Sequence, residues 1–303
     1  MSGATTAWTD RLAAQEADAV SALFARATAA DGLAPVSEQA TVSLRSEDGT
    51  RHLLVVREGA VAGYASLVAA HGEHPAMAEV VVDPSARGHG VGRDLVAAAL
   101  GEGGRGARVW AHGDLPAAKA VAAKLGLRAA RELWQMRRDL ATSQLPDLIV
   151  PAGLRVRTYA GSSDDAELLR VNNAAFDWHP EQGGWTERDI EARKAESWFD
   201  PEGLFLVSEV DDPEILLGFH WTKVHFDEDP PVGEVYVVGV DPAAQGRGLG
   251  RLLTLAGLHH LRQRQLAEVL LYTEGDNTAA VRTYTQLGFE PAHIDTAYAE
   301  QPD

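Results

Sequence analysis

The fold is indicated first by the segment Val235-Tyr-Val-Val-Gly-Val-Asp-Pro-Ala-Ala-Gln-Gly-Arg-Gly-Leu-Gly250. Its apolar beginning is typical of a buried β-strand, and the leucine-rich pattern after Gly250 is typical of a helix. A turn between them presents unpaired backbone N–H groups at the helix start, where phosphate binds. The glycines leave room for a pyrophosphate, and Arg247 and Arg251 add positive charge. The segment therefore predicts a phosphate-binding loop between a strand and a helix.

The same pattern occurs a second time, nearer the N-terminus. Val80-Val-Val-Asp-Pro84 is followed by Arg87-Gly-His-Gly-Val-Gly92. The Asp-Pro pairs and the loop starts are both 158 residues apart (83 to 241, and 87 to 245), and the later Leu-Gly pairs are 162 apart (126 to 288). The chain is therefore predicted to be two copies of one unit. We expect one domain over 1–140, a proline-bracketed linker over 141–153 and a second domain over 154–303.

Apolar periodicity predicts that strands and helices alternate in both halves. The expected fold class is α/β, an α+β mixed sheet flanked by helices and built twice. In the second half we expect strands at 154–158, 204–210, 215–224, 234–240 and 269–273, helices at 164–175, 249–264 and 277–287, and a closing hairpin at 289–298. In the first half we expect strands at 52–57, 61–69, 78–82 and 107–111, and helices at 91–100 and 116–125.

Composition limits the partners. The formal net charge of −17 argues against nucleic acid and anionic membranes and favours a neutral or cationic small molecule. No apolar run reaches the roughly 20 residues of a membrane span, and no secretion signal is evident, so we expect a cytoplasmic protein. We also expect a monomer. The sequence has no cysteine, which excludes a disulfide framework and a thiol nucleophile, and no metal site is expected.

The loop pattern, Gln or Arg followed by x-x-Gly-x-Gly after Asp-Pro, resembles the coenzyme A motif of the GNAT acetyltransferase family. It differs from the dinucleotide fingerprint and from the P-loop. The resemblance implies two tandem GNAT-like domains and acetyl-CoA as the cosubstrate. A further match is Asn277-Thr-Ala-Ala-Val-Arg-Thr-Tyr-Thr-Gln-Leu-Gly-Phe289, whose tyrosine, here Tyr284, usually protonates the departing thiolate in the family. The alternative for Tyr284 is a ring packed on an amphipathic helix.

Transfer to an amine requires a general base, because an α-amine with a pKa of about 8 is mostly protonated at neutral pH. Glu234 begins the strand that leads into the second loop, and we expect it to be this base, directly or through a water. The alternative is a solvated charge at a strand end. At the positions of Tyr284 and Asn277 the first half has Ala122 and Leu115, and Glu79 lies in a different register from Glu234. The first half is therefore predicted to be degenerate, able to bind cofactor without catalysis.

A closer resemblance covers nearly the whole chain. It is to the mycothiol synthase family of tandem GNAT chains, through Asp31-Gly-Leu-Ala-Pro-Val-Ser-Glu38, Phe176-Asp-Trp-His-Pro-Glu-Gln-Gly-Gly-Trp185, Gly218-Phe-His-Trp-Thr-Lys223 and Gly233-Glu-Val-Tyr-Val-Val-Gly-Val-Asp-Pro242. The resemblance implies acetylation of the cysteinyl amine of cysteinyl-glucosaminyl-inositol, 1D-myo-inositol 2-(L-cysteinylamino)-2-deoxy-α-D-glucopyranoside. That reaction is the last step of mycothiol biosynthesis.

The same resemblance implies the residues of the site. The implied substrate contacts are Glu38, Glu181, Lys223, Glu234 and Tyr272. The implied acetyl-CoA contacts of the second half are Val238, Gly239, Val240, Gln245, Gly246, Arg247, Gly248, Leu249, Gly250, Arg251, Asn277, Thr278, Ala279, Ala280, Val281 and Arg282. A second acetyl-CoA would be held by Val80, Val81, Val82, Gly88, His89, Gly90, Val91, Gly92 and Arg93.

Other functions stay open on the residues alone, because the loop reports the donor and says little about the acceptor. The nearest is a GNAT enzyme for another amine, such as a protein N-terminus or an aminoglycoside. A second is a non-catalytic acetyl-CoA-binding module, and a third is a structural tandem domain without a ligand. Consumption of the thioester would separate an enzyme from a binding module, and a panel of amines would separate the acceptors.

Overall fold

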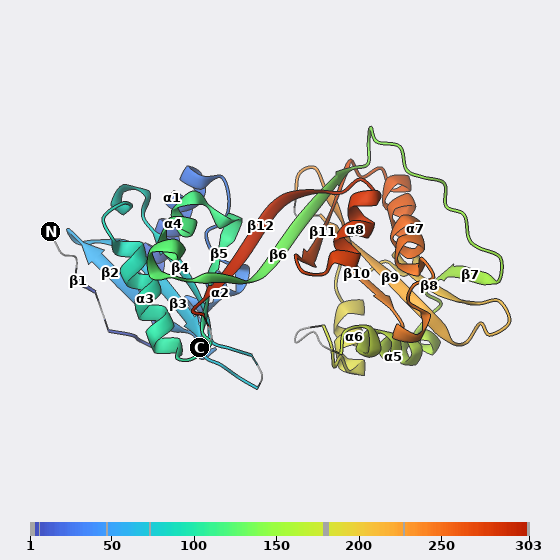
Figure 1. The fold of residues 1–303 in the computed structure, drawn as a ribbon, viewed down its shortest axis with the longest axis horizontal. Coiled ribbons are helices and arrows are strands. Elements are labelled where there is room, and N and C mark those ends of the chain that lie inside the picture. The colour runs from blue at the N-terminus through green and yellow to red at the C-terminus, as the bar shows by residue number, and fades with distance from the viewer. Residues whose placement is uncertain are drawn as a thin grey trace. The chain divides into compact units, whose positions relative to one another are not determined.

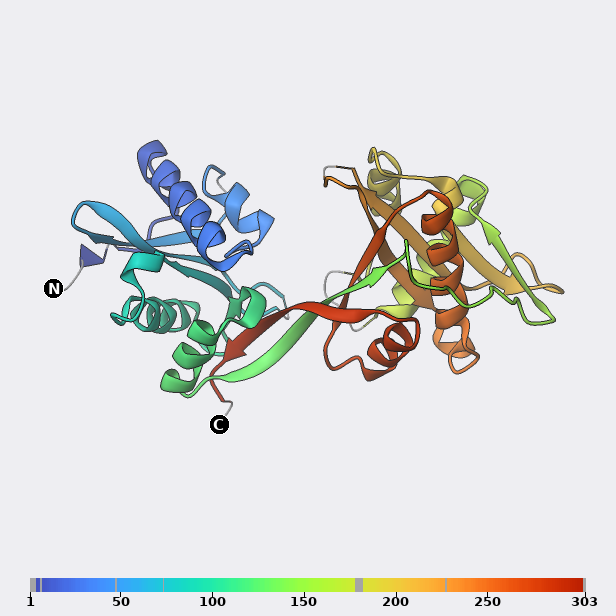
Figure 2. The same cartoon turned by 90° about the horizontal axis from the view of Figure 1, so that it is seen from above.

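The computed structural model describes residues 4–5, 7–46, 48–72, 74–177, 182–226 and 228–301. The chain forms two compact units, drawn as ribbons in Figure 1 and Figure 2. Unit 1 comprises Met1–Leu133 together with His293–Asp303, and unit 2 comprises Trp134–Ala292. These bounds differ from the expected halves, because the last strand of the chain completes the sheet of unit 1. The expected linker, 141–153, contains neither helix nor strand.

Unit 1 is a mixed sheet covered on both faces. Its strands, in spatial order, are β1 (Ala4–Thr5), β2 (Arg51–Arg57), β3 (Ala60–Val68), β4 (Met77–Val82), β5 (Arg108–Ala111) and β12 (Glu290–Ala299). Its helices are α1 (Ala14–Asp31), α2 (Glu38–Ser43), α3 (Val91–Gly103) and α4 (Pro116–Leu125), with short 3-10 turns η1 (Pro84–Ala86) and η2 (His112–Asp114). Figure 2 shows α1 on one side of this sheet and α3 with α4 on the other. The parallel pair is β4 with β5.

Unit 2 repeats this architecture. Its strands, in spatial order, are β6 (Arg128–Asp139, of which residues 134–139 belong to unit 2), β11 (Glu268–Glu274), β10 (Val232–Val240), β9 (Leu216–His225), β8 (Leu204–Glu209) and β7 (Leu154–Thr158). Its helices are α5 (Asp165–Ala175), α6 (Glu187–Lys194), α7 (Leu249–Gln263) and α8 (Thr278–Gln286), with 3-10 turns η3 (Ser162–Asp164), η4 (Pro201–Gly203) and η5 (Pro242–Ala244). In Figure 1, α7 and α8 lie on the opposite side of the sheet from α5 and α6.

Helix α7 contributes a row of leucines to the hydrophobic core of unit 2. Leu255, Leu258 and Leu261 recur at helical spacing and pack, almost fully buried, against Val235 and Leu271 of the two central strands. Each such leucine contributes roughly 2 kcal/mol from the apolar surface that it removes from water. Residues that alternate with Val235 and Leu271 along β10 and β11 therefore project from the opposite face of the sheet.

The mixed α/β class and the tandem repeat are confirmed. Each predicted strand and helix is present, β7 and α4 with the predicted ends and the others with shifted ends. The predicted hairpin at 289–298 is wrong, because this segment forms the single strand β12 and pairs with β5. Helices α1, α2 and α6 and the strands β1 and β6 were not predicted. Within the described part of the chain, every helix is too short or too polar to cross a membrane.

Candidate active site

The two glycine loops have the same backbone conformation. Gly88 and Gly90 have φ angles of 78° and 87°, and Gly246 and Gly248 have 79° and 77°. These left-handed values are strained for any residue with a Cβ, which explains the glycines. Gly90 and Gly248 directly precede the first residues of α3 and α7. The unpaired N–H groups of each first helical turn are therefore available to a phosphate.

An aspartate fixes the entry to each loop. Asp83 accepts a hydrogen bond from the backbone of Ser85 (3.0 Å), and Asp241 accepts one from Ala243 (2.9 Å). Each also pairs with an arginine, Asp83 with Arg26 of α1. The corresponding partner of Asp241 is Arg170 of α5. These bonds stabilise the 3-10 turns η1 and η5. The backbone at the two aspartates is nearly identical, with φ −52° and ψ 131° at Asp83 and φ −51° and ψ 129° at Asp241.

In both units the two central parallel strands separate just before the loop. The pairing of β10 with β11 ends at Val235 and Leu271, and the pairing of β4 with β5 ends at Glu79 and Trp110. Residues Val238 to Val240 and Val80 to Val82 lie beyond these last pairs. Backbone amides in such a gap can form hydrogen bonds with the amide groups of an extended ligand.

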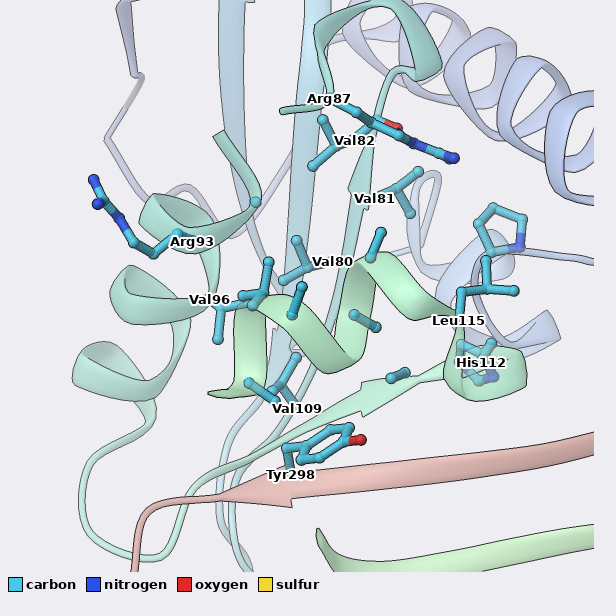
Figure 3. Close-up of a pocket in the computed structure, with 18 of the residues that line it drawn as sticks. Val80, Val81, Val82, Arg87, Arg93, Val96, Val109, His112, Leu115 and Tyr298 are labelled. Atoms are coloured by element: carbon cyan, nitrogen blue, oxygen red, sulfur yellow. The ribbon is translucent and has the colours of Figure 1, made fainter. Parts of the chain in front are cut away.

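A cavity of about 350 Å³ adjoins the gap in unit 1. Figure 3 shows the side chains of Val80, Val96 and Val109 around it, with Arg87 at its upper margin. Alanines of α4 form much of the remaining wall, and Gly88, Gly90 and Gly92 of the loop also line it. Arg87 itself is paired with Asp31 (2.7 Å). An apolar cavity beside a helix N-terminus suits a ligand with an uncharged arm and a phosphate group.

Polar side chains gather on one face of the sheet of unit 2. Glu234 of β10 pairs in register with Lys223 of β9 and with Leu270 of β11, and Tyr272 follows Leu270 by two residues. Cross-strand partners, and residues two apart, project from the same face. Three of the predicted substrate residues, on three adjacent strands, therefore share the face opposite α7. Among them Glu234 is buried, with 7% exposed, whereas Tyr272 is 48% exposed.

Each of these side chains has a defined neighbour. The Glu234 carboxylate lies 2.7 Å from Nε2 of His225. The Lys223 ammonium lies over the rings of Trp198 (5.4 Å) and Tyr236 (5.7 Å), where the ring faces attract a cation. The Tyr272 hydroxyl accepts a hydrogen bond from Gln135 Nε2 at 2.7 Å. Sequence reasoning missed His225, although its position two residues after Lys223 on the same strand was a usable signal.

Tyr284 belongs to α8, and Asn277 directly precedes the first residue of this helix. The Asn277 side chain caps α8 by accepting a hydrogen bond from the backbone of Ala280 (3.1 Å), so residues 278–282 form the open start of a helix. Tyr284 packs edge-on against Phe289, with ring centroids 5.8 Å apart. Burial raises the pKa of the Tyr284 hydroxyl to about 12, so it carries its proton at neutral pH.

The equivalent region of unit 1 is occupied by a charged network. Glu79 accepts hydrogen bonds from the backbone and hydroxyl of Ser37 (2.7 and 2.6 Å) and from His112 (2.9 Å), and His112 also contacts Asp295. Burial alone would lower the pKa of His112, but the bonds to Asp295 and Glu79 raise it to about 9. Burial would raise the pKa of Glu79, and the bonds from His112 and Ser37 lower it instead. Glu79 is therefore a poor proton acceptor.

Two further residues, Glu38 and Glu181, were predicted as substrate contacts. Glu38 is the first residue of α2 in unit 1, where its side chain is exposed. Glu181 lies outside the described residues. In the described part of the chain, clusters of three or more histidine, aspartate or glutamate side chains able to hold a metal are absent.

Comparison with known proteins agrees with this repeated architecture. The family model of the acetyltransferase (GNAT) family matches residues 18–127 and again residues 170–289. Two solved structures show the same fold. One is a GCN5-related N-acetyltransferase from Sphaerobacter thermophilus, with a TM-score of 0.71 and 23% identity over 95% of this chain and 93% of that one. The other is a tandem GNAT protein from the clavulanic acid biosynthesis pathway, with a TM-score of 0.66 and 21% identity over 99% and 100%.

Curated relatives match from end to end. A mycothiol acetyltransferase from Nocardia farcinica is 71% identical over 99% of both chains. The protein of the same name from Rhodococcus jostii is 60% identical over 99% of both, and that from Mycolicibacterium smegmatis is 54% identical over 97% of this chain and 99% of its own. Members of the GNAT family take their acetyl group from acetyl-CoA. The chain belongs to the GNAT acetyltransferase family, and it is an N-acetyltransferase.

Proposed function

We propose that the chain transfers the acetyl group of acetyl-CoA to the cysteinyl amine of cysteinyl-glucosaminyl-inositol and so forms mycothiol. The observation that carries this proposal is the polar face of unit 2, where Glu234, Lys223 and Tyr272 lie together beside the gap that leads to the second glycine loop. The names of relatives that are 54 to 71% identical support the same acceptor.

The donor would bind along β10 and α7. Its pyrophosphate would lie against the N–H groups from Gly246 to Arg251, because the left-handed glycines open the helix start to it. Its pantetheine arm would lie in the gap beyond Val235, where its amide groups would form hydrogen bonds with the backbone of β10. The thioester oxygen would then accept a hydrogen bond from the backbone near Val238, which stabilises the negative charge that develops on it. Residues 277–282, at the start of α8, would flank the arm.

The acceptor would lie on the polar face. A pseudo-disaccharide offers hydroxyl groups and one ammonium. The hydroxyl groups suit the Lys223 ammonium and the Tyr272 hydroxyl, and the ammonium suits the Glu234 carboxylate. The Trp198 and Tyr236 rings keep the Lys223 side chain over this face. Glu38 and Glu181 stay predictions, as contacts that the family resemblance implies.

The chemistry would need one base and one acid. Glu234 takes a proton from the cysteinyl ammonium, and the neutral amine then attacks the thioester carbon. The C–S bond breaks, and Tyr284 donates its hydroxyl proton to the departing sulfur, which is possible because the hydroxyl is protonated at neutral pH. After the attack the nitrogen loses a second proton, which restores the Tyr284 hydroxyl, and the proton on Glu234 passes to water. The products are the amide and free CoA, with one proton released for each protonated amine consumed.

Unit 1 would hold a second acetyl-CoA without transferring its acetyl group. Its loop has the same left-handed glycines, and an apolar cavity adjoins that loop. Catalysis there is disfavoured, because Glu79 is engaged by Ser37 and His112 and because Ala122 stands where unit 2 has Tyr284. A cytoplasmic monomer with no nucleic-acid or membrane partner stays a prediction of the composition.

An acceptor panel tests the function directly. The purified chain is incubated with acetyl-CoA and, separately, with cysteinyl-glucosaminyl-inositol, the des-cysteinyl amine glucosaminyl-inositol, free cysteine, an aminoglycoside and a peptide with a free N-terminus. Release of CoA and the mass of the product are measured. The proposal expects rapid N-acetylation of the first acceptor and at least tenfold lower kcat/KM for the others. Preference for the aminoglycoside or the peptide would replace the proposed acceptor.

A further inference from the structure

The base proposed for unit 2 has a partner from the neighbouring strand. His225 is the last residue of β9, and Glu234 lies near the start of β10. In the antiparallel register His225 pairs with Val232 and Lys223 pairs with Glu234, so the imidazole reaches the carboxylate diagonally across the ladder. The distance from His225 Nε2 to Glu234 Oε2 is 2.7 Å.

The Glu234 carboxylate in this contact is buried, whereas the His225 imidazole is partly exposed to solvent. The Glu234 side chain is 9% exposed, and that of His225 is 21% exposed. An ionised carboxylate can only accept hydrogen bonds, so Nε2 of His225 must carry the hydrogen. The bond therefore runs from Nε2–H to Oε2. Glu234 Oε1 is left without a hydrogen bond from the described residues.

We propose that His225 is a positioning residue for the acetyl transfer, because it holds Oε2 of Glu234 and leaves Oε1 as the atom that takes the amine proton. This inference rests on the proposed function, in which Glu234 is the base. A buried carboxylate with one of its oxygens fixed is confined to one rotamer. The amine then meets a base whose lone pair already points at it, and the cost of ordering the side chain is not added to the barrier.

The neighbours of the pair favour a role in catalysis over one in stability. On the same face, Lys223 is drawn toward the rings of Trp198 and Tyr236, and Arg137 of β6 pairs with Glu268 of β11 at 2.6 Å. Glu234 therefore depends on His225 for its orientation. Because β9 and β10 are paired on both sides of a bulge between Val235 and Val237, as far as Val240, the two strands are held together without the imidazole.

Two amide replacements separate positioning from packing. In His225→Gln the amide nitrogen can occupy the place of Nε2 and still donate to Glu234. In His225→Asn the amide nitrogen takes the place of Nδ1 and falls short of the carboxylate. Both variants are uncharged and polar, so they form a matched pair. His259→Asn, at an exposed histidine of α7 that contacts the backbone of Pro146, is the control for the loss of an imidazole.

Steady-state kinetics with acetyl-CoA and cysteinyl-glucosaminyl-inositol provide the measurement. A hydrogen bond to a charged group contributes roughly 1.5–3 kcal/mol, which corresponds to a tenfold or greater fall in rate. We expect kcat of His225→Asn to fall at least tenfold with the KM for acetyl-CoA unchanged, and His225→Gln to recover most of it. Unfolding temperatures within a degree or two of wild type would show that all variants fold alike.

The outcomes that overturn the inference are distinct from those that overturn the function. Wild-type kcat in His225→Asn, or equal losses in the Asn and Gln variants, would eliminate the positioning role while the acetyl transfer stands. Turnover of Glu234→Gln at the wild-type rate would remove Glu234 as the base and the role of His225 with it. Absence of turnover by the wild-type chain with this acceptor would refute the proposed function itself.

Discussion

Glu79 and Glu234 lie on equivalent strands of the two repeated units, yet their carboxylates have different neighbours. Glu79 accepts three hydrogen bonds, two from Ser37 and one from His112. Glu234 receives one, from His225, among the bonds of the described residues. The first carboxylate is engaged as a structural acceptor, whereas the second has an oxygen to offer to a substrate. The repeat thus preserves the loops and changes the chemistry of the neighbouring strand.

Replacement of Glu234 tests this difference. Glu234→Gln keeps the size of the side chain but cannot take a proton, so we expect kcat to fall by about a hundredfold or more, the range of general base catalysis. Glu79→Gln in unit 1 is the matched control, and its kcat should stay within about twofold of wild type. Release of CoA, followed with a thiol reagent, measures both. A larger loss in Glu79→Gln would place the chemistry in unit 1.

Tyr284→Phe removes one hydroxyl and keeps the ring that packs on Phe289. We expect a smaller fall in kcat, about tenfold to a hundredfold, because CoA thiolate can also leave without a proton donor. Burial raises the pKa of this hydroxyl to about 12, so its loss of a proton should not limit kcat between pH 8 and pH 10. A steep decline of wild-type kcat in that range that disappears in Tyr284→Phe would contradict the assignment.

The glycine loops can be tested one at a time. Gly248 has a left-handed φ of 77°, so Gly248→Ala adds strain of roughly 1 kcal/mol and a methyl group at the helix start. We expect the KM for acetyl-CoA to rise at least fivefold. Gly90→Ala introduces the same strain in unit 1, at φ 87°, and should weaken only the second acetyl-CoA in a calorimetric titration. Equal effects of the two variants on KM would mean that the loops do not act separately.

The charged network of unit 1 should make stability depend on pH. In the folded chain the pKa of His112 is raised from 6.5 to about 9, by bonds to Asp295 and Glu79 that outweigh burial. A histidine whose pKa is raised on folding stabilises the folded state fully when the pH lies below the pKa of the same histidine in the unfolded chain. The contribution of His112 is therefore complete below about pH 6.5 and is lost as the pH rises through about 9. The free energy of unfolding in urea should therefore decrease over that window. His112→Gln should show a flatter profile, and identical profiles would exclude the network as the cause.

Local backbone rules made the loops predictable from sequence. An Asp-Pro pair after an apolar run is followed by a glycine at every second position. Within ten residues this pattern specifies a 3-10 turn, residues with left-handed backbone and the start of a helix. The leucine-rich pattern after Gly250 similarly indicated α7. These features depend on neighbours in sequence, and a single chain displays them.

Contacts between distant segments were not predictable in this way. Nothing in the pattern of 289–298 distinguishes a hairpin from a strand that pairs with β5, because pairing partners are set by the whole fold. The link between His225 and Glu234 depends on a register across a turn, and a shift by one residue would have moved the imidazole to the other face. Alanine-rich α1 has few large apolar residues to mark its period, although it supplies part of the core of unit 1.

The placement of β12 in unit 1 has a practical consequence for anyone who wishes to produce the halves separately. A polypeptide ending at residue 140 would leave β5 as a bare edge, without Asp295 to anchor His112. One starting at residue 154 would lose the part of β6 that belongs to unit 2. Exposed edges of this kind recruit strands from other molecules, so isolated halves should aggregate, whereas co-expressed halves should rescue each other by intermolecular complementation.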